Sequence, residues 1–276
     1  MDARNVTMEF SIASATVRTL RSFTRLQASL STSALSATER AKELAGITAV
    51  DQVVIPLLNE KKHCAIGLGS GSTIEYAIKR IAALQATNCA YVPTSFQTKH
   101  LILQHKLRLA SLEEYPKLDL TIDGADEVDT SLNCIKGGGA CLFQEMLVAR
   151  ASKRFILVAD GRKQSKQLGT KWQRGVPVEV IPMAYGSVQR VLHRLYPDAD
   201  IRLRMALPQD KAGPVVTDNG NFILDCSLQG LKNPAKVYKE IKLITGVVEV
   251  GLFCNMADTA FFGIENGTVD VWRQDG

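Results

Sequence analysis

The stretch of chain between residues 123 and 145 carries side chains that can move a proton and stabilise a negative charge. Its ionisable side chains and its glycine run are, in order, Asp123, Asp126, Glu127, Asp129, Lys136, Gly137–Gly139 and Glu145. A carboxylate can act as a general base, and a lysine or free backbone N–H groups can stabilise the oxyanion that then forms. Three consecutive glycines are costly to order, which favours a loop that a ligand approaches closely. The alternative interpretation is an acidic surface turn followed by a flexible loop.

A second candidate site follows the apolar run at residues 63–68. The segment Gly69-Ser70-Gly71-Ser72-Thr73 separates this run from a helical pattern. A strand, a glycine-rich turn and a helix N-terminus together present N–H groups and a positive dipole end, which suit an anion. The segment is not a dinucleotide fingerprint, because Ser72 stands where the third glycine would be, and it lacks the Gly-Lys-Ser/Thr of a P-loop. A tight turn that needs glycine only for its geometry is the other interpretation.

The elements that must position these residues alternate between strand and helix. Strands are expected at 63–68, 90–92, 118–122 and 155–159, and helices at 74–84, at 96–105 and around Glu145. This alternation predicts a parallel sheet covered on both faces. Ligands of such sheets bind at the carboxyl ends of the strands, so both candidate sites are expected at one edge. Lys163, after the strand at 155–159, would join them there; a solvated loop lysine is the alternative.

The pattern changes after about residue 168. Short strands are expected at 176–181, 201–205, 215–216 and 222–225, and helices at 187–195 and 234–244. Short strands mixed with two helices predict a small α+β domain. Strand-rich runs at 247–254 and 261–272 follow, and Asn266-Gly267 in the second run is typical of a hairpin turn.

The composition of the chain excludes several classes of protein. Its 276 residues are 46% hydrophobic and 22% charged, as is ordinary for a globular protein of one or two domains. The net charge of +5 is too weak and dispersed to indicate nucleic-acid binding, and no apolar run is long enough to span a bilayer. The six cysteines form no Cys-x-x-Cys pair, and the four histidines show no metal-ligand spacing. We therefore expect free thiols in a reducing compartment, no metal, no membrane partner and no nucleic-acid partner.

The first 35 residues differ from the rest. No acid occurs from Ser11 to Thr38, whereas arginines alternate there with Ser, Thr, Leu and Val, a pattern that resembles a mitochondrial transit peptide. Because Asp2 and Glu9 lie near the start, we favour a disordered extension and a cytoplasmic protein, with mitochondrial or other targeting as the alternative. The capping box Ser36-Ala37-Thr38-Glu39 predicts that the folded body begins there, with a helix that breaks or bends near Gly46.

Several motifs in a fixed order carry a family resemblance. They are Gly69-Ser70-Gly71-Ser72-Thr73, Asp123-Gly124-Ala125-Asp126-Glu127, Lys136-Gly137-Gly138-Gly139, Val176-Pro177-Val178-Glu179-Val180-Ile181-Pro182 and Val216-Thr217-Asp218-Asn219-Gly220-Asn221. From about residue 40 to the C-terminus, the chain resembles the type A family of ribose-5-phosphate isomerases. Several long motifs in order are far more specific than any one of them.

The resemblance implies a fold, a reaction and an assembly. It implies an α/β fold with a Rossmann-like parallel sheet domain (36–171 plus 249–276) and a second, smaller ferredoxin-like α+β domain (172–248) that is often involved in oligomer contacts. It leaves residues 1–35 as an extension. The implied reaction interconverts ribose 5-phosphate and ribulose 5-phosphate in the non-oxidative pentose phosphate pathway without a cofactor. The implied assembly is a homodimer or homotetramer.

The resemblance also assigns site residues. Glu145 matches the catalytic base, Asp123 and Asp126 match carboxylates near the sugar hydroxyls, and Lys136 belongs to a ligand loop. The residues implied to bind substrate are Ser70, Gly71, Ser72, Thr73, Gly124, Ala125, Gly137, Gly138, Gly139 and Lys163. The family usually has lysine after the glutamate, where this chain has Met146; a helix neighbour points about 100° away, so we expect little effect.

Aldose–ketose isomerisation moves a proton between C2 and C1 through an enediolate. One carboxylate of raised pKa can make both transfers, while Lys136 and the glycine-loop backbone stabilise the charge on oxygen. Asp123 or Asp126 could shuttle the proton that opens the sugar ring. Two other functions remain open: a sugar-phosphate sensor, which should add a DNA-binding helix-turn-helix, and an acyl or CoA transferase with a glutamate near glycine loops.

Overall fold

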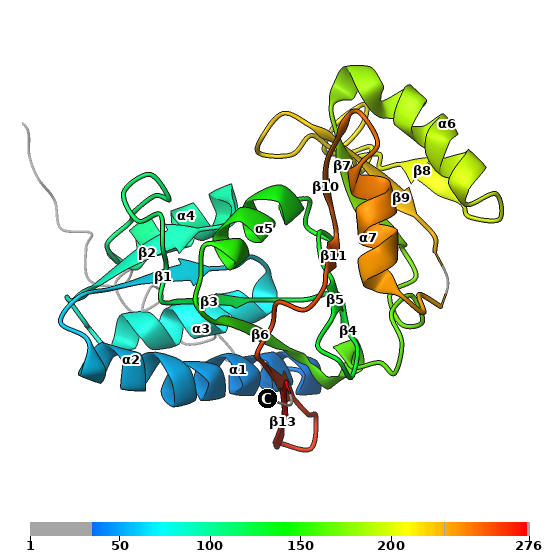
Figure 1. Ribbon diagram of the computed structural model, residues 1–276. Helices are drawn as coiled ribbons and strands as arrows, with labels where there is room; N and C mark the ends of the chain where they lie inside the picture. The colour runs from blue at the N-terminus through cyan, green and yellow to red at the C-terminus, as the bar shows by residue number, and fades with distance from the viewer. Residues whose placement is uncertain (1–34, 229, 275–276) are drawn as a thin grey trace, which may run out of the picture. The chain divides into compact units, whose positions relative to one another are not determined.

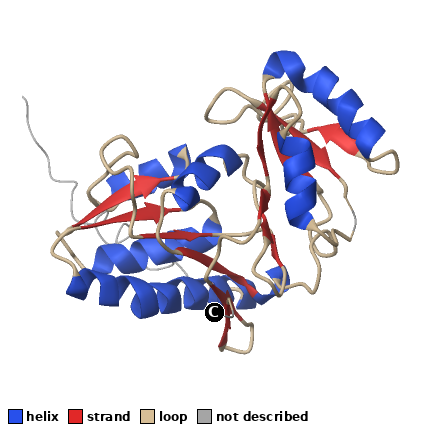
Figure 2. Cartoon of the chain, viewed as in Figure 1, coloured by secondary structure: helices blue, strands red, loops and turns tan. Residues whose placement is uncertain are grey.

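The computed structural model describes residues 35–228 and 230–274. Within these ranges the strands form a six-stranded, mainly parallel sheet, a four-stranded antiparallel sheet and a three-stranded antiparallel sheet (Figures 1 and 2). The predicted fold class, a parallel α/β sheet with a smaller α+β part, is confirmed. The predicted extension at 1–35 lies, except for Leu35, outside the described residues. The predicted domain boundaries at 171/172 and 248/249 stay a prediction.

The six-stranded sheet has the order β13-β12-β6-β3-β1-β2. The bounds are β1 Cys64–Leu68, β2 Cys89–Pro93, β3 Leu120–Asp123, β6 Phe155–Asp160, β12 Thr259–Gly263 and β13 Val269–Arg273. All neighbours are parallel except β12 and β13, which form the predicted hairpin around Asn266 and Gly267. The C-terminal strands thus return to the first sheet, and the carboxyl ends of β1, β3 and β6 lie at one edge.

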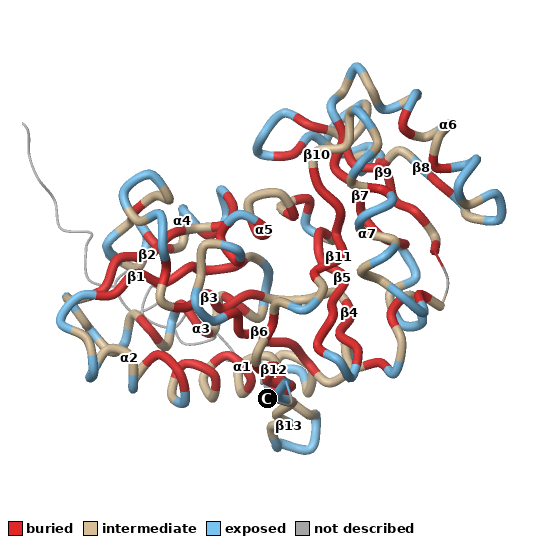
Figure 3. The backbone as a smooth tube through the Cα atoms, viewed as in Figure 1, coloured by how far each residue is buried: buried red, intermediate tan, exposed pale blue. Residues whose placement is uncertain are grey.

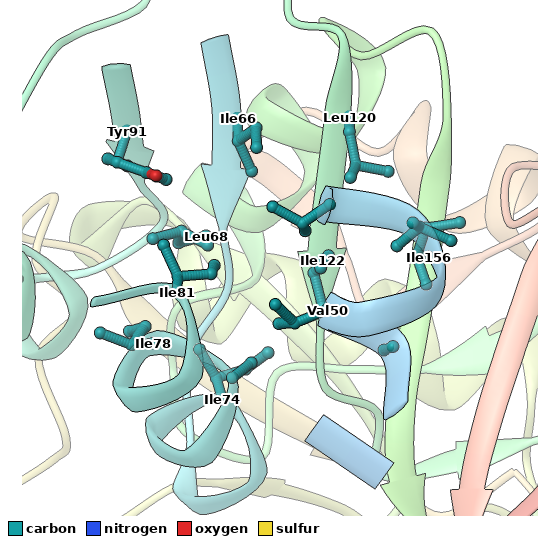
Figure 4. Close-up of a cluster of buried hydrophobic side chains, with 14 of the residues drawn as sticks. Val50, Ile66, Leu68, Ile74, Ile78, Ile81, Tyr91, Leu120, Ile122 and Ile156 are labelled. Carbon is teal, nitrogen blue, oxygen red and sulfur yellow. The ribbon is translucent and has the colours of Figure 1, made fainter. Parts of the chain in front are cut away.

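Helices cover both faces of this sheet. On one face lie α1 (Ala37–Ala49), a π-helical stretch (Val50–Val54), α2 (Ile55–Glu60) and α3 (Ser72–Ala83), while α5 (Leu142–Arg150) covers the other and α4 (Phe96–Gln104) packs beside β2 (Figure 1). The buried residues of α3 recur every three or four positions, so they form one apolar stripe. This stripe packs on the β1 and β3 side chains in the core of Figure 4. The strands of this sheet are almost wholly buried, except the edge strand β13, which has no buried residue (Figure 3).

The predicted break near Gly46 is wrong. The helix continues through Gly46, which is buried in α1, and passes directly into the π-helical stretch at Val50. A Cβ atom at residue 46 would lie 3.0 Å from the backbone nitrogen of Ala77 and 3.1 Å from the carbonyl oxygen of Thr73 in α3. The glycine therefore permits close packing of α1 on α3, and this packing outweighs the roughly 1 kcal/mol that glycine costs in a helix.

The second part of the chain forms the four-stranded sheet, in the order β10-β7-β9-β8. Its strands are β7 Val176–Val180, β8 Ile201–Leu203, β9 Phe222–Cys226 and β10 Val247–Val250, and its helices are α6 Tyr185–Leu195 and α7 Pro234–Lys242. Both helices bury apolar side chains on the sheet. The strand predicted at 215–216 is wrong: β9 already pairs with β7 and β8, and Val215 only donates its N–H to the Arg204 carbonyl.

The three-stranded sheet joins segments that are distant in sequence. It contains β4 (Glu127–Val128), β5 (Cys134–Ile135) and β11 (Leu252–Phe253). Lys136 directly follows β5, and its N–H donates to the Gly251 carbonyl next to β11. This pairing holds the start of the glycine loop in place. No helix among the described residues is long and apolar enough to cross a bilayer.

Candidate active site

A cavity of about 260 Å³ lies where β1, β3 and β6 end. Its walls include all the residues predicted to bind substrate, namely Ser70, Gly71, Ser72, Thr73, Gly124, Ala125, Gly137, Gly138, Gly139 and Lys163. Three of the residues predicted to be catalytic, Asp126, Lys136 and Glu145, also line it. Asp123 does not line the cavity: it is fully buried behind Lys136. The tertiary structure thus brings the two candidate sites of the sequence together in one cavity.

Glu145 reaches the cavity from the first turn of α5. The helix begins at Leu142, because Ala140, two residues earlier, has a φ of +60° and cannot be part of a right-handed helix. The Glu145 carboxylate lies with Oε1 3.2 Å from the Lys136 Nζ, while the buried Oε2 accepts no hydrogen bond from the described residues. A buried carboxylate oxygen without a donor is available to a ligand.

Lys136 lies at the centre of a buried charge cluster. Its Nζ donates to the Gly124 carbonyl at 2.5 Å, lies 3.0 Å from the Asp123 Oδ2, and sits 5.5 Å from the centre of the Phe253 ring. The Asp123 Oδ1 in turn accepts hydrogen bonds from the Ser70 N–H at 3.1 Å and from the Gly124 N–H at 2.7 Å. Asp123 therefore anchors the lysine from behind and ties it to the loop at the anion end of the cavity.

Burial dominates the titration of this cluster. It raises the pKa of Glu145 to about 8, because desolvation disfavours the charged carboxylate; Lys136 opposes the rise, and the charges of Asp123 and Asp126 add to it. Burial also raises the pKa of Asp123, against the pull of Lys136. For Lys136 burial acts to lower the pKa, but the two carboxylates outweigh it and hold the pKa above the usual range. The cluster thus combines a permanent cation with a carboxyl that titrates near neutral pH.

The glycine loop needs its glycines for close approach. Gly137 has a φ of +99°, and the Gly138 N–H donates to the Asp126 Oδ2 at 2.7 Å. A Cβ atom at residue 138 would lie 2.6 Å from the Asp126 Oδ1. The loop can therefore lie against Asp126 only without side chains, which leaves its backbone exposed to the cavity.

The other end of the cavity is the N-terminus of α3. Gly71 is the N-cap, with a φ of +94°, and its N–H donates to the Gln97 Oε1 at 3.0 Å. The Ser70 hydroxyl is engaged in a cluster, at 2.7 Å from the Ser95 Oγ and 2.9 Å from the Thr94 Oγ1. Gly71 and Ser72 are exposed. This end therefore offers backbone donors and the hydroxyls of Ser72 and Thr73 to an anion.

Two acids of the 123–129 stretch serve the fold. Glu127 is fully buried and accepts the N–H groups of residues 169 to 172, where Trp172 donates at 3.1 Å; these bonds outweigh burial and lower the pKa of Glu127. Asp129 accepts N–H donors from Ser131 and Asn133 at 2.9 Å each. Both carboxylates are satisfied by the protein and lie outside the cavity wall.

The structure adds residues that sequence reasoning did not select. Lys42 of α1, Gln97 of α4 and three residues near β6 or α5 also line the cavity, namely Asp160, Arg162 and Cys141. The Arg162 Nε lies 2.7 Å from the Asp160 Oδ1, and the Lys163 Nζ lies 5.3 Å from the centre of the Trp172 ring. Arg162 could have been found, because it precedes Lys163 in the same predicted loop. Lys42 gave no signal, because only the packing of α1 brings it to the cavity.

No group of three or more His, Cys, Asp and Glu side chains among the described residues is arranged to hold a metal ion. The positive charge at the buried end comes from Lys136. The absence of a metal from the reaction stays a prediction.

Comparison with known proteins places the chain in a family. The profile of the ribose 5-phosphate isomerase A (phosphoriboisomerase A) family matches residues 90–267. A human ribose-5-phosphate isomerase is 49% identical over 242 residues, covering 87% of this chain and 75% of that protein. The Candida albicans enzyme is 47% identical over 245 residues, covering 88% of this chain and 100% of that protein.

Solved structures agree. A D-ribose-5-phosphate isomerase in complex with phospho-erythronic acid has a TM-score of 0.77 at 35% identity, covering 86% of this chain and 99% of that one. The isomerase from Plasmodium falciparum has a TM-score of 0.78 at 30% identity, covering 86% of this chain and 100% of that one. The chain belongs to the ribose 5-phosphate isomerase A family.

Proposed function

We propose that the cavity interconverts D-ribose 5-phosphate and D-ribulose 5-phosphate, with Glu145 as the base that carries the proton. The observation that supports this most is the buried Glu145 carboxylate, whose Oε2 has no donor among the described residues while Oε1 lies against Lys136. Family membership supports the substrate, which is the one in the relatives' names.

Glu145 has the environment that such a base requires. In the open-chain aldose, its carboxylate takes the proton from C2, the electron pair moves toward the C1 carbonyl, and an enediolate forms. Return of the proton to C1, with transfer of the O2 proton to O1, gives the ketose. A base with a pKa near the working pH can both accept and return the proton, and the pKa of about 8 for Glu145 suits this.

Lys136 and the glycine loop stabilise the enediolate. The Lys136 ammonium is held by Asp123 and the Gly124 carbonyl, so it need not reorganise when negative charge develops on O1 and O2. Gly139 of the loop also lines the cavity, and its N–H has no acceptor among the described residues, so it can serve as a further donor. A related structure holds phospho-erythronic acid, a phosphate joined through a short chain to a carboxylate. Such a carboxylate carries planar negative charge like that of the enediolate, which supports this assignment.

The phosphate binds at the α3 end. The free N–H groups and hydroxyls of Ser72 and Thr73 lie there, and Lys42 and Lys163 line the same cavity. The positive end of the α3 dipole favours the dianion. Binding energy from this remote group can hold C1 and C2 at the base.

Ring opening is assigned to Asp126 in preference to Asp123. Asp126 lines the cavity and is partly exposed, so it can exchange a proton with the ring oxygen or the anomeric hydroxyl. Asp123 is fully buried and already accepts two N–H donors beside Lys136, so its role is to hold the lysine.

Glu145→Gln tests the base. The substitution keeps size and hydrogen-bonding capacity but removes the proton acceptor, so kcat should fall by at least about 10²-fold with KM little changed. Ribulose formation from ribose 5-phosphate would be followed together with exchange of the carbon-bound hydrogen into deuterated water. The assay would be run after dialysis against EDTA, because Lys136 supplies the positive charge and activity should survive.

Glu60→Gln is the matched control, because Glu60 is exposed at the end of α2 and lies outside the cavity wall. It should leave kcat unchanged. Near-normal hydrogen exchange by Glu145→Gln would place the base elsewhere, with Asp126 as the next candidate. Loss of activity on EDTA treatment that Mg²⁺ or Zn²⁺ restores would contradict the metal-free mechanism.

We also propose an assembly and a location for the protein. A homodimer or homotetramer fits the large exposed side chains Met183 and Leu243, which the α+β part presents to solvent. A cytoplasmic location fits the six cysteines, all free; the alternative, targeting by residues 1–35, concerns a segment that is almost wholly outside the described residues.

A further inference from the structure

An arginine of the four-stranded sheet reaches the glycine loop of the cavity. Arg204 directly follows β8, and its side chain is only 6% exposed. Its Nη1 donates to the Gly137 carbonyl at 2.9 Å and to the Gly138 carbonyl at 3.1 Å. The Arg204 backbone is fixed as well, because its N–H donates to the Ile223 carbonyl and its carbonyl accepts from Val215. The guanidinium is therefore held rigidly behind the loop.

Asp225 of β9 fixes the plane of this guanidinium. The Arg204 Nε donates to the Asp225 Oδ2 at 2.8 Å and Nη2 donates to Oδ1 at 2.5 Å. Such a two-bond pair sets direction as well as position. With Nε and Nη2 engaged by Asp225, Nη1 is the nitrogen that faces the loop, and it binds two carbonyls at once.

The held carbonyls determine where the loop N–H groups point. Among the described residues every peptide bond is trans, so the C=O of one residue and the N–H of the next point in opposite directions. Fixing the Gly137 carbonyl on Arg204 turns the Gly138 N–H to the other side, where it meets the Asp126 Oδ2 at 2.7 Å. Fixing the Gly138 carbonyl turns the Gly139 N–H away from Arg204 in the same manner. No acceptor among residues 35–228 and 230–274 takes the Gly139 N–H, and Gly139 lines the cavity.

Within the loop, the Ala140 N–H donates to the Gly137 carbonyl at 3.0 Å, but glycine has the widest choice of backbone conformations, so partners outside the loop are needed to fix all three residues. Donors aimed in advance at a developing oxyanion stabilise it more than donors that must reorient. A cation bonded to the carbonyl side of a peptide also polarises it, which makes the N–H on the far side a better donor.

We propose that Arg204 is a positioning residue for the isomerisation: through the Gly138 carbonyl it aims the Gly139 N–H at the enediolate oxygens, and through the Gly137 carbonyl it holds the Gly138 N–H on Asp126. The proposal rests on the proposed function. It assigns the four-stranded sheet a part in the chemistry, because that sheet supplies both Arg204 and Asp225. A solely structural role for the ion pair is the competing interpretation.

Two variants separate these interpretations. Arg204→Lys keeps the charge beside Asp225 but cannot bind two carbonyls and a carboxylate in one plane. The double variant Arg204→Met, Asp225→Leu removes both buried charges together, and such replacements are often neutral or stabilising. If Arg204 positions the loop, both variants should fold with a melting temperature near that of the parent, while kcat falls about tenfold to a hundredfold and KM changes little.

Binding of two phosphorylated ligands provides a readout that lost stability would not produce. Phospho-erythronic acid carries the planar charge of the enediolate, whereas ribitol 5-phosphate carries the same phosphate without that charge. The variants should lose about tenfold or more in affinity for phospho-erythronic acid and less than about threefold for ribitol 5-phosphate, because only the first needs the aimed donors.

Arg202→Met is the matched control, because Arg202 lies on β8, pairs with Asp200 and is 61% exposed. It should change neither kcat nor either affinity. The proposal is overturned if folded Arg204→Lys or the folded double variant keeps kcat within twofold, or loses affinity for both ligands equally. Failure of both variants to fold would assign the pair to stability and would also overturn it. An inactive parent protein would instead reject the proposed function, so the two failures can be told apart.

Discussion

The two ends of the cavity use charge in opposite ways. At the Glu145 end, Lys136 is 2% exposed, Glu145 is 5% exposed and Asp123 is fully buried. The Lys136 Nζ lies 3.0 Å from the Asp123 carboxylate and 3.2 Å from the Glu145 carboxylate. At the α3 end, Gly71 and Ser72 are exposed. The first end is withdrawn from water and the second is open to it.

This difference suits the two tasks. Electrostatic interactions are several times stronger where water is excluded, so a few buried groups can shift a pKa and stabilise an enediolate. A phosphate is already charged before binding and needs only a steering field and N–H donors, which tolerate solvent. The comparison predicts that a change at the buried end mainly affects kcat, whereas a change at the open end mainly affects KM.

The largest effect is expected from Lys136→Met. Loss of the cation leaves Asp123 and Glu145 close together without a counter-charge, so the pKa of Glu145 rises further and the base is protonated at neutral pH. The enediolate also loses its ammonium partner. We expect kcat to fall by about 10³-fold or more, measured in the isomerase assay with folding checked by circular dichroism.

Lys153→Met is the control for this substitution, because Lys153 pairs with Asp119 on the surface with 64% of its side chain exposed. It should keep full activity. Appreciable activity in a folded Lys136→Met protein would show that the glycine-loop donors suffice and that the buried end does not depend on its cation.

A smaller effect, confined to KM, is expected from Ser72→Asp. The new carboxylate would stand at the first residue of α3, a position that tolerates Asp well, so the fold should persist. It would repel the phosphate dianion, and KM should rise by about tenfold or more with kcat within a fewfold of the parent, because a pair of like charges costs on the order of 1–2 kcal/mol at an exposed site. Ser72→Asn matches Asp in size and also loses the hydroxyl but adds no charge, so it should raise KM by clearly less than Ser72→Asp does. An unaltered KM in Ser72→Asp would indicate that the loop is a turn and not the phosphate site.

The smallest effect concerns the ligand-free protein and pH. The folded pKa of Glu145 is raised from 4.5 to about 8, so the neutral carboxyl favours the folded state. This contribution is complete below about pH 4.5 and is lost as the pH rises to about 8. Glu145→Gln lacks this titration. The difference in melting temperature, variant minus parent, should therefore be several degrees larger at pH 8 than at pH 5.

The activity of the parent should depend on the ionisation of the same Glu145 carboxyl. The kcat/KM of the parent should fall below about pH 8, because the base must be ionised to accept the C2 proton. A difference in melting temperature between parent and Glu145→Gln that stays constant from pH 5 to pH 8 would mean that Glu145 is not held neutral by burial. That result would weaken the contrast between the two ends of the cavity.

Most of the fold could be predicted from the sequence. Short apolar runs located the strands of the large sheet, and a helical pattern located α3, to within a few residues, because these elements bury continuous apolar surface. The glycine at residue 46 was misleading, because the packing of α1 on α3 outweighs its low helix propensity. This could not be deduced from the sequence, since it depends on a neighbour that is distant in the chain.

The sequence by itself also determined which residue types stand at the carboxyl ends of the strands: acids, a lysine, glycines and hydroxyls. The tertiary structure decided how their roles divide. Of four neighbouring acids, only Asp126 lines the cavity, while Asp123 anchors Lys136 and the other two hold loops. It also brought in Lys42 and Arg204 from remote segments. The physical reason is that charge and hydrogen-bonding type are local properties of the chain, whereas burial and the choice of partner exist only after distant segments pack together.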